Sequence, residues 1–291
     1  GGGGGGGRIA ILYQSLGTPH SVRLSAVAGL GAYEIHTSEA GLEARHGTIY
    51  LPDTNLLSGT IDNLGGRVVI SNTTAWTTTS LMVTNTSLGF DDNFTLNVVG
   101  DLIVAGNNTM LLTGTNAPAM VGGALRLQNG GRLALQGNLT SGGDMALENG
   151  TNILVARGNV LINCGDNFIM TNGGVAYLYC GRTNGLGRDY GILVSATNDM
   201  SIAPSSWIYP YSHFSDGGSC LFTMNNLTIP TNAGFNADWK GFNGAWSGSG
   251  YGAGAGTYSG GGAGYGGKGG KTSLSGLPGN PYGLTNAPIQ P

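Results

Sequence analysis

The fold of this chain is limited most by a long series of short apolar runs, each bounded by Gly, Asn or Asp. The runs have three to five residues and either alternate or carry β-branched side chains, which is typical of β-strands. Examples are 67–70, 81–84, 94–98, 101–104, 110–113, 124–127, 132–135, 152–155, 159–162 and 191–194. An apolar pattern of helical period is missing, apart from one or two helical turns that 38–45 could form. The sequence therefore predicts an all-β fold.

The connectors between the runs favour a parallel β-helix, also called a β-solenoid. Asn-Gly-Gly at 129–131 and 172–174, Asn-Gly at 149–150 and Gly-Gly at 217–218 follow apolar runs. Asn and Gly tolerate the left-handed backbone angles of sharp corners. A sandwich or jelly roll, the alternative, usually needs longer crossings than the segment before residue 235 offers. With rungs of roughly 20 to 25 residues stacked about 4.8 Å apart, 8–235 would form about ten rungs in a rod on the order of 50 Å long.

Composition divides the chain at about residue 235. We expect a β-solenoid with an N-terminal polyglycine segment at 1–234, and a glycine/aromatic-rich lobe followed by an extended arm at 235–291. The second part repeats the pattern Phe-Asn-x-x-Trp-x-Gly at 235–241 and 242–248, and three tyrosines follow at seven-residue spacing. Glycine lets backbones approach closely, and spaced aromatic rings supply apolar area, so we expect an ordered lobe. A flexible tail is the alternative.

The low charge of the chain argues against two classes of partner. Only 9% of the residues are charged, the formal net charge is -3, and the 12 Lys and Arg residues are scattered, so no nucleic-acid surface is expected. No apolar run approaches the ~20 residues of a membrane span, so none is expected. Weak charge favours association, and this surface suits a protein that packs against copies of itself.

No catalytic, cofactor or metal site is expected, and the chain is not expected to be an enzyme. Acidic residues that could serve a polysaccharide lyase, a hydrolase or a calcium site stand mostly beside Gly or Asn, where Asp forms turns. These residues are Asp91, Asp92, Asp101, Asp144, Asp166, Asp189 and Asp199. Calcium at Asp91 and Asp92 stays open as an alternative. The charge-dense segment 34–46 predicts a solvated excursion or a subunit contact.

The chain has three cysteines, Cys164, Cys180 and Cys220. An odd count in this length is not a disulfide framework, and no Cys-x-x-Cys or paired His spacing indicates zinc. We expect small buried hydrophobic side chains, and a disulfide within one pair stays open.

The two ends of the chain carry a family resemblance. Gly1 to Gly7 run straight into Arg8-Ile-Ala, Gly-Thr-Ile-Tyr follows at 47–50, and Ile-Asp-Asn follows at 61–63. These segments resemble a glycine-rich repeat of very large secreted bacterial surface proteins, which are similar to parallel β-helix adhesins and surface-layer fibres. The glycine- and tyrosine-rich segments at 264–270 and 281–283 resemble the part that precedes the next glycine run. The resemblance implies one repeat-length unit, extracellular or on the cell surface, without assigned chemistry.

The primary functional hypothesis is a structural protein whose identical subunits join head to tail into a filament, sheath or surface layer. A solenoid exposes unpaired backbone groups at its ends unless a cap covers them, and no amphipathic capping helix is evident. The candidate residues for self-assembly or adhesion are Gly1, Gly7, Arg8, Trp239, Trp246, Tyr251, Tyr258 and Tyr265. The first alternative is an adhesin or carbohydrate-binding module, with surface glycans as partners. A β-helix polysaccharide lyase or hydrolase is the second.

Overall fold

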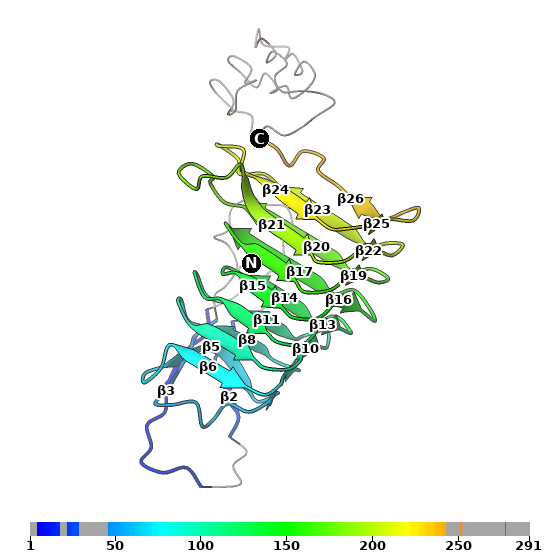
Figure 1. Cartoon of the computed structure of the whole chain (residues 1–291). Helices are drawn as coiled ribbons and strands as arrows, with labels where there is room; N and C mark the ends of the chain where they lie inside the picture. The colour runs from blue at the N-terminus through cyan, green and yellow to red at the C-terminus, as the bar shows by residue number, and fades with distance from the viewer. Residues whose placement is uncertain (1–4, 18–21, 29–45, 243–250, 252–276, 278–291) are drawn as a thin grey trace.

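The computed structural model describes residues 5–17, 22–28, 46–242, 251 and 277 (Figure 1). Within them the chain winds into a parallel β-solenoid of about eight turns, with no helix. Every strand pair is parallel, which confirms the expected β-helix, and the sandwich alternative is wrong. No helix in the described part is long and apolar enough to cross a membrane. The short helix expected at 38–45 lies outside the described residues.

Three parallel sheets form the sides of the coil (Figure 1). The first contains β1 (Arg8–Ala10), β3 (Thr48–Leu51), β5 (Leu64–Ile70), β8 (Ser87–Phe90), β11 (Met110–Leu112), β14 (Arg132–Leu135), β17 (Ile153–Gly158), β20 (Val175–Cys180), β23 (Trp207–Tyr211) and β26 (Gly234–Phe235), and β2 (Leu24–Ser25) pairs with β5. The second contains β4 (Thr60–Ile61), β7 (Leu81–Thr84), β10 (Leu102–Ala105), β13 (Leu125–Gln128), β16 (Met145–Glu148), β19 (Phe168–Met170), β22 (Met200–Ile202) and β25 (Leu227–Thr228). The third contains β6 (Ala75–Thr78), β9 (Thr95–Val98), β12 (Ala119–Val121), β15 (Leu139–Ser141), β18 (Leu161–Cys164), β21 (Tyr190–Ala196) and β24 (Ser219–Thr223).

The turns in the middle of the coil have nearly constant length. Ser87 pairs with Met110, Met110 with Arg132 and Arg132 with Ile153, so each turn takes 21 to 23 residues, as expected. The expected total of ten turns is too high because two passes are longer. Arg8 pairs with Thr48, and Val175 with Trp207, which takes 40 and 32 residues.

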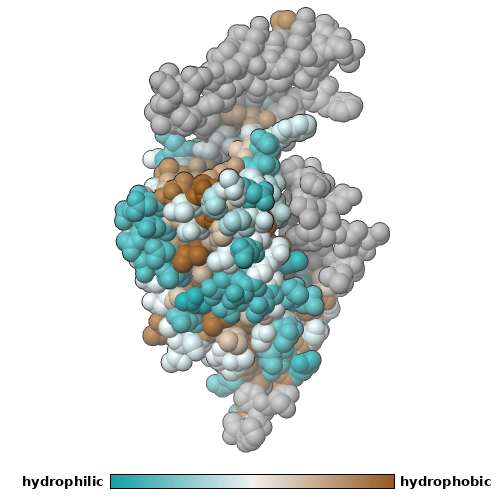
Figure 2. Space-filling model, turned by 90° about the vertical axis from the view of Figure 1, so that its right-hand side faces the viewer, coloured by the Kyte–Doolittle hydropathy of each residue, from teal (hydrophilic) through white to brown (hydrophobic). Residues whose placement is uncertain are grey.

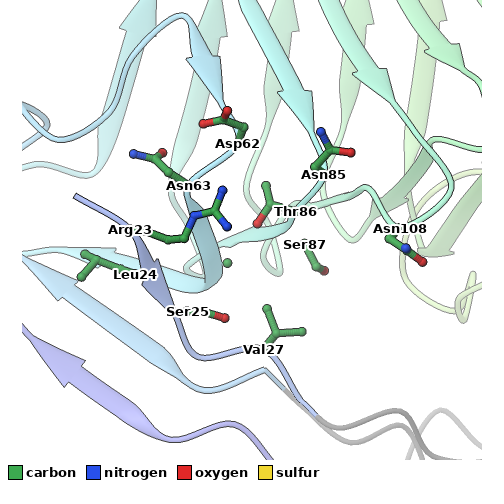
Figure 3. A pocket seen from close by; sticks show the side chains of 11 residues that line it. Arg23, Leu24, Ser25, Val27, Asp62, Asn63, Asn85, Thr86, Ser87 and Asn108 are labelled. Carbon is green, nitrogen blue, oxygen red and sulfur yellow. The ribbon is translucent and has the colours of Figure 1, made fainter. Parts of the chain in front are cut away.

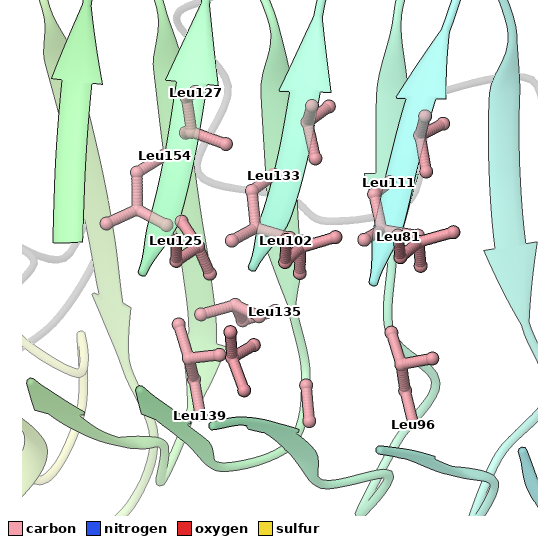
Figure 4. Packing of buried hydrophobic residues seen from close by; sticks show 14 of the residues in the cluster. Leu81, Leu96, Leu102, Leu111, Leu125, Leu127, Leu133, Leu135, Leu139 and Leu154 are labelled. Carbon is pink, nitrogen blue, oxygen red and sulfur yellow. The ribbon is translucent and has the colours of Figure 1, made fainter. Parts of the chain in front are cut away.

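The core consists of columns of side chains that run along the coil axis (Figure 4). One column from the second sheet holds Leu81, Leu102 and Leu125, which occupy the same register position on successive turns. Leu111, Leu133 and Leu154 form the matching column of the first sheet. All six are at most 1% exposed. Alternation along each short strand places every second side chain in these columns, because successive side chains point to opposite faces.

The corner between the second and first sheets uses left-handed backbone, as the connectors predicted. Asn129 and Asn149 have φ of 54° and 60°, and Gly130 and Gly173 have φ of 88° and 83°. A buried polar column lies directly beside this corner. Thr109, Asn152 and Ser206 are each 0% exposed and bond to backbone groups of their own or neighbouring turns. These side chains supply the hydrogen bonds that a buried corner backbone needs.

The expected division at residue 235 falls inside the last strand, β26. Residues after it continue along the first sheet, where Asn236 N donates to Ile208 O and Ser212 N donates to Lys240 O. Apart from Tyr251 and Leu277, the expected glycine/aromatic lobe and arm beyond residue 242 lie outside the described residues.

Candidate functional site

The two ends of the coil are the candidate site for assembly. At the C-terminal end, β24, β25 and β26 are the outermost strands of the three sheets, and no described strand pairs with their outer edges. These edges form what we call the C-terminal end face. None of the three strands contains Lys, Arg or Pro, which commonly protect exposed edges from pairing.

At this face, the last side chain of a core column is exposed to solvent. Phe168, Met200 and Leu227 occupy one register position on three successive turns of the second sheet. Phe168 and Met200 are 1% and 0% exposed, whereas Leu227 is 46% exposed. The change follows from position, because Leu227 lies on the last strand of its sheet. A leucine at a core position is therefore half in solvent.

The first sheet and the third sheet end in a similar way. Phe222 of β24 follows the buried Val194, and Phe235 of β26 follows the buried Ile208. The two phenylalanine rings meet edge to face with centroids 4.8 Å apart, and both are only partly buried. The last core layer is thus incompletely covered by described residues.

The opposite end carries β1, β2, β4 and β6 as its outermost strands, and we call their outer edges the N-terminal end face. Gly7 O accepts a hydrogen bond from Thr48 N, which fastens the end of the glycine run to the coil. Arg8 begins β1 and is exposed, and Leu12 just beyond this strand is 78% exposed. Gly7 and Arg8 therefore lie at this face, as a role in assembly requires. Gly1 lies outside the described residues.

An aromatic stack on the first sheet was not predicted from the sequence. Tyr177 and Tyr179 of β20 stack on Tyr209 and Tyr211 of β23, on the outer side of the first sheet. Ring centroids are 5.2 Å apart in the first pair and 4.4 Å in the second. The available signal was the pattern Tyr-x-Tyr in two runs, at 177–179 and 209–211.

A cationic side chain lies at each end of the stack that contains Tyr179 and Tyr211. Arg157 Cζ lies 4.7 Å from the centroid of Tyr179, and Lys240 Nζ lies 5.0 Å from that of Tyr211. Along the axis the order is Arg157, Tyr179, Tyr211 and Lys240, so both faces of each ring are in contact with protein. These rings hold neighbouring turns together through stacking and cation–π contacts, and their faces are not offered to a sugar.

The predicted adhesion residues are only partly described. Trp239 is 102% exposed and has φ of 63°, so its indole projects from a tight turn. Tyr251 is 46% exposed and meets Phe214 edge to face with centroids 5.8 Å apart. Trp246, Tyr258 and Tyr265 lie outside the described residues, so no grouping of the five rings is established.

A groove of about 210 Å³ opens beside β2 and the corner before β8 (Figure 3). Among the described residues that line it, only Arg23 and Asp62 are charged. Ser87, which also lines it, lies 2.6 Å from His46 Nε2, which resembles a nucleophile and its base. His46 Nδ1, however, accepts a hydrogen bond from Ala28 N at 3.1 Å. A neutral imidazole therefore carries its proton on Nε2 and donates to Ser87, so it cannot remove the proton of Ser87.

The carboxylates of the aspartates at the corner before the second sheet accept hydrogen bonds from the next turn of the coil. Asp101 accepts from Ala124 N, and Asp144 accepts from Asn167 N, each one turn further along the chain. Asp199 continues the same corner column and accepts from the side chain of Asn226. These contacts join successive turns of the coil, whereas the sequence context predicted that the aspartates form their own local turns.

Asp91 and Asp92, the expected calcium alternative, both face a cation of the protein. Arg67 forms ion pairs with the two carboxylates, the second at 3.3 Å, and Asp92 also accepts from Thr115 N. Calcium would have to compete with this guanidinium. In the described part of the chain, no group of three His, Cys, Asp or Glu residues is arranged to hold a metal ion.

A scan against protein-family models, a search of curated proteins and a search of solved structures each returned no match to this chain. The site is therefore interpreted from its own geometry.

Proposed function

We propose that this protein is a structural β-solenoid subunit that joins identical copies end to end outside the cell, and that it has no catalytic role. The observation that carries the proposal is Leu227, a core-column leucine that is 46% exposed at the C-terminal end face. Burying apolar surface is worth roughly 25 cal/mol per Å². A second coil stacked on this face would bury Leu227 and pair the open edge of β26.

Strand direction is compatible with this arrangement. All pairs in the coil are parallel, and β1 and β26 are the two ends of the strand path through the first sheet. The N-terminal end face of one copy can follow the C-terminal end face of another with β1 beside β26, while β4 and β6 lie further from the junction because their sheets have fewer strands. Such a contact joins two different surfaces, so it extends without closing. Its product is a filament.

The side of the coil offers a less defined surface. Figure 2, which looks at the molecule from the right-hand side of Figure 1, shows hydrophilic and hydrophobic residues mixed over the described surface. Met120, on the outward side of β12, is 48% exposed in the middle of the coil. It provides a control for Leu227, because the two apolar side chains have similar exposed fractions and Met120 lies away from both end faces.

The test compares Leu227→Lys with Met120→Lys in negative-stain microscopy and sedimentation velocity. We expect wild type and Met120→Lys to form filaments, and Leu227→Lys to stay short or monomeric because a charge would be buried at each junction. Wild-type protein that remains monomeric at high concentration would refute the proposal. Equal assembly of both variants would refute the C-terminal end face as the junction.

One observation favours adhesion as a second candidate function. Trp239 is fully exposed in a left-handed turn, and an exposed indole can stack on a sugar ring. The test is binding to immobilised glycans by wild type and Trp239→Ala. Loss of binding in the variant would support the adhesin, and binding that is unchanged or absent in both would reject Trp239 as its site.

A further inference from the structure

We propose that Cys180 and Cys220 form a disulfide bond that fastens the last three-stranded turn of the coil to the turn before it. Their sulfur atoms lie 3.1 Å apart across a separation of 40 residues. A closure of about 1 Å brings two sulfurs from this distance to bond length. In the described structure both side chains are free thiols.

The two cysteines meet at the corner between the first and third sheets. Cys180 is the last residue of β20, and Cys220 lies in β24, one turn further along the axis. Cys220 pairs in register with Ile192, which is 0% exposed, so it occupies a core position. Cys180 is itself buried at 6% exposure. Both sulfurs therefore point into the same interior corner from neighbouring turns.

The third cysteine has a different environment. Cys164 Sγ lies 3.1 Å from Asn167 O and 3.4 Å from Gly143 O, so its thiol donates to backbone carbonyls. Cys180 and Cys220 instead have each other as the nearest sulfur partner. This difference makes Cys164 an internal control, because it is buried and satisfied as a thiol.

The reaction needs an oxidant, which we take to be a small-molecule disulfide such as oxidised glutathione. One protein thiolate attacks the oxidant and releases one small thiol, leaving a mixed disulfide. The second protein thiolate then attacks the sulfur bonded to the protein and releases the second small thiol. The two cysteines lose two hydrogens in total, and the oxidant is reduced to two thiols.

Burial determines when this reaction can occur. The hydrogen bond to Cys180 and burial raise the pKa of the Cys220 thiol well above its usual value. A thiol that stays protonated attacks a disulfide slowly. We therefore expect the bond to form while the last turns are folding in an oxidising compartment, before the corner closes.

The bond would act across a long connection of the coil. The 40-residue stretch between the cysteines contains the longest connection after β3, 181–189, and the strands β21, β22 and β23. A cross-link that closes a long loop restricts the unfolded chain most. It would hold the turn that carries the C-terminal end face, and it does not depend on whether that face binds another copy.

The experiment refolds the full chain from denaturant in a mixture of reduced and oxidised glutathione, then alkylates free thiols and measures intact mass and peptide maps. We expect one alkylated cysteine of three, Cys164, and a Cys180–Cys220 cross-linked peptide. Cys164→Ser should keep the bond and show no alkylated cysteine. Cys220→Ser should lose it, with Cys164 and Cys180 both alkylated.

A second measurement covers the case in which the chain refolds poorly. Protein secreted by an expression host into an oxidising compartment is alkylated before lysis and mapped in the same way. Three alkylated cysteines, or a bond that includes Cys164, would overturn the proposal in either preparation. A disulfide between copies, detected as a dimer that reductant separates, would overturn it as well.

Discussion

The ring of Tyr179 lies nearly flat on the ring of Tyr211, with centroids 4.4 Å apart and planes inclined by 21°. The two residues are 32 positions apart in the chain, yet the register of β20 and β23 places them side by side. Parallel stacking turns each outer side-chain position into a column, so like residues at one position add their contacts along the axis. The stability of this coil therefore depends on its outer side as well as on its core.

Replacing either ring should weaken the C-terminal turns. We expect Tyr211→Leu to lower the free energy of unfolding by about 1–2 kcal/mol, since the stack and the contact with Lys240 are lost together. A double-mutant cycle with Tyr179→Leu should give a coupling of about 0.5–1.5 kcal/mol in urea unfolding. Tyr50→Leu, at an exposed outer position of β3, is the matched control and should change stability by less than about 0.5 kcal/mol. Additive effects of the two substitutions would contradict the stack.

The same stack predicts a loss of stability at high pH. Burial, together with the neighbouring Tyr211 hydroxyl, raises the pKa of Tyr179 from 10.0 to about 12. Above about pH 10 the unfolded chain releases this proton and the folded chain keeps it. Ionisation therefore stabilises the unfolded state relative to the folded state. The contribution is present below about pH 10 and is lost as the pH approaches about 12.

The urea midpoint of the wild type should therefore fall more steeply over this range than that of Tyr179→Phe. A titration of phenolate absorbance should lose one late-ionising group in the variant. Midpoints of the two proteins that fall in parallel would show that Tyr179 does not govern the effect.

Much of the fold was predictable because its signals are local. Alternation in runs such as 81–84 and left-handed Asn and Gly at 129–130 concern only neighbouring residues, and both are confirmed. These two signals are sufficient for an all-β coil with sharp corners. The number of turns was not predictable, because it depends on how many residues the long passes consume.

The candidate site depends on register, which a single sequence does not specify. Whether Tyr179 meets Tyr211, or Cys180 meets Cys220, is decided by the length and path of the connection at 181–189. That connection is rich in Gly and polar residues and carries no periodic pattern. The exposure of Leu227 could not be predicted for a related reason, since its sequence context resembles that of the buried members of its column.

A glycine at a close backbone approach should not tolerate alanine. A Cβ atom on Gly142 would collide with the carbonyl oxygen of Gly122 on the preceding turn, and neither backbone can move without breaking a sheet. We expect Gly142→Ala to destabilise the coil by about 1–3 kcal/mol in thermal or urea unfolding. Gly241→Ala, where a Cβ atom meets nothing within 4 Å, should lie within about 0.5 kcal/mol of wild type. Equal stability of both variants would mean that the turns can separate at this corner.

The buried corner column should be as sensitive as the core. Asn152 is 0% exposed, its Nδ2 donates to Glu148 O at 2.7 Å and Gly150 O at 3.0 Å, and its Oδ1 accepts from Gly130 N at 3.0 Å. In Asn152→Ala these backbone groups lose a buried partner, and one unsatisfied group costs about 1–3 kcal/mol. We expect a loss of about 2–4 kcal/mol in unfolding free energy, because more than one group is affected. Asn184→Ala, at an exposed position of the 181–189 connection, should be nearly neutral. A small effect of Asn152→Ala would mean that water replaces the amide, and the corner would then be open to solvent.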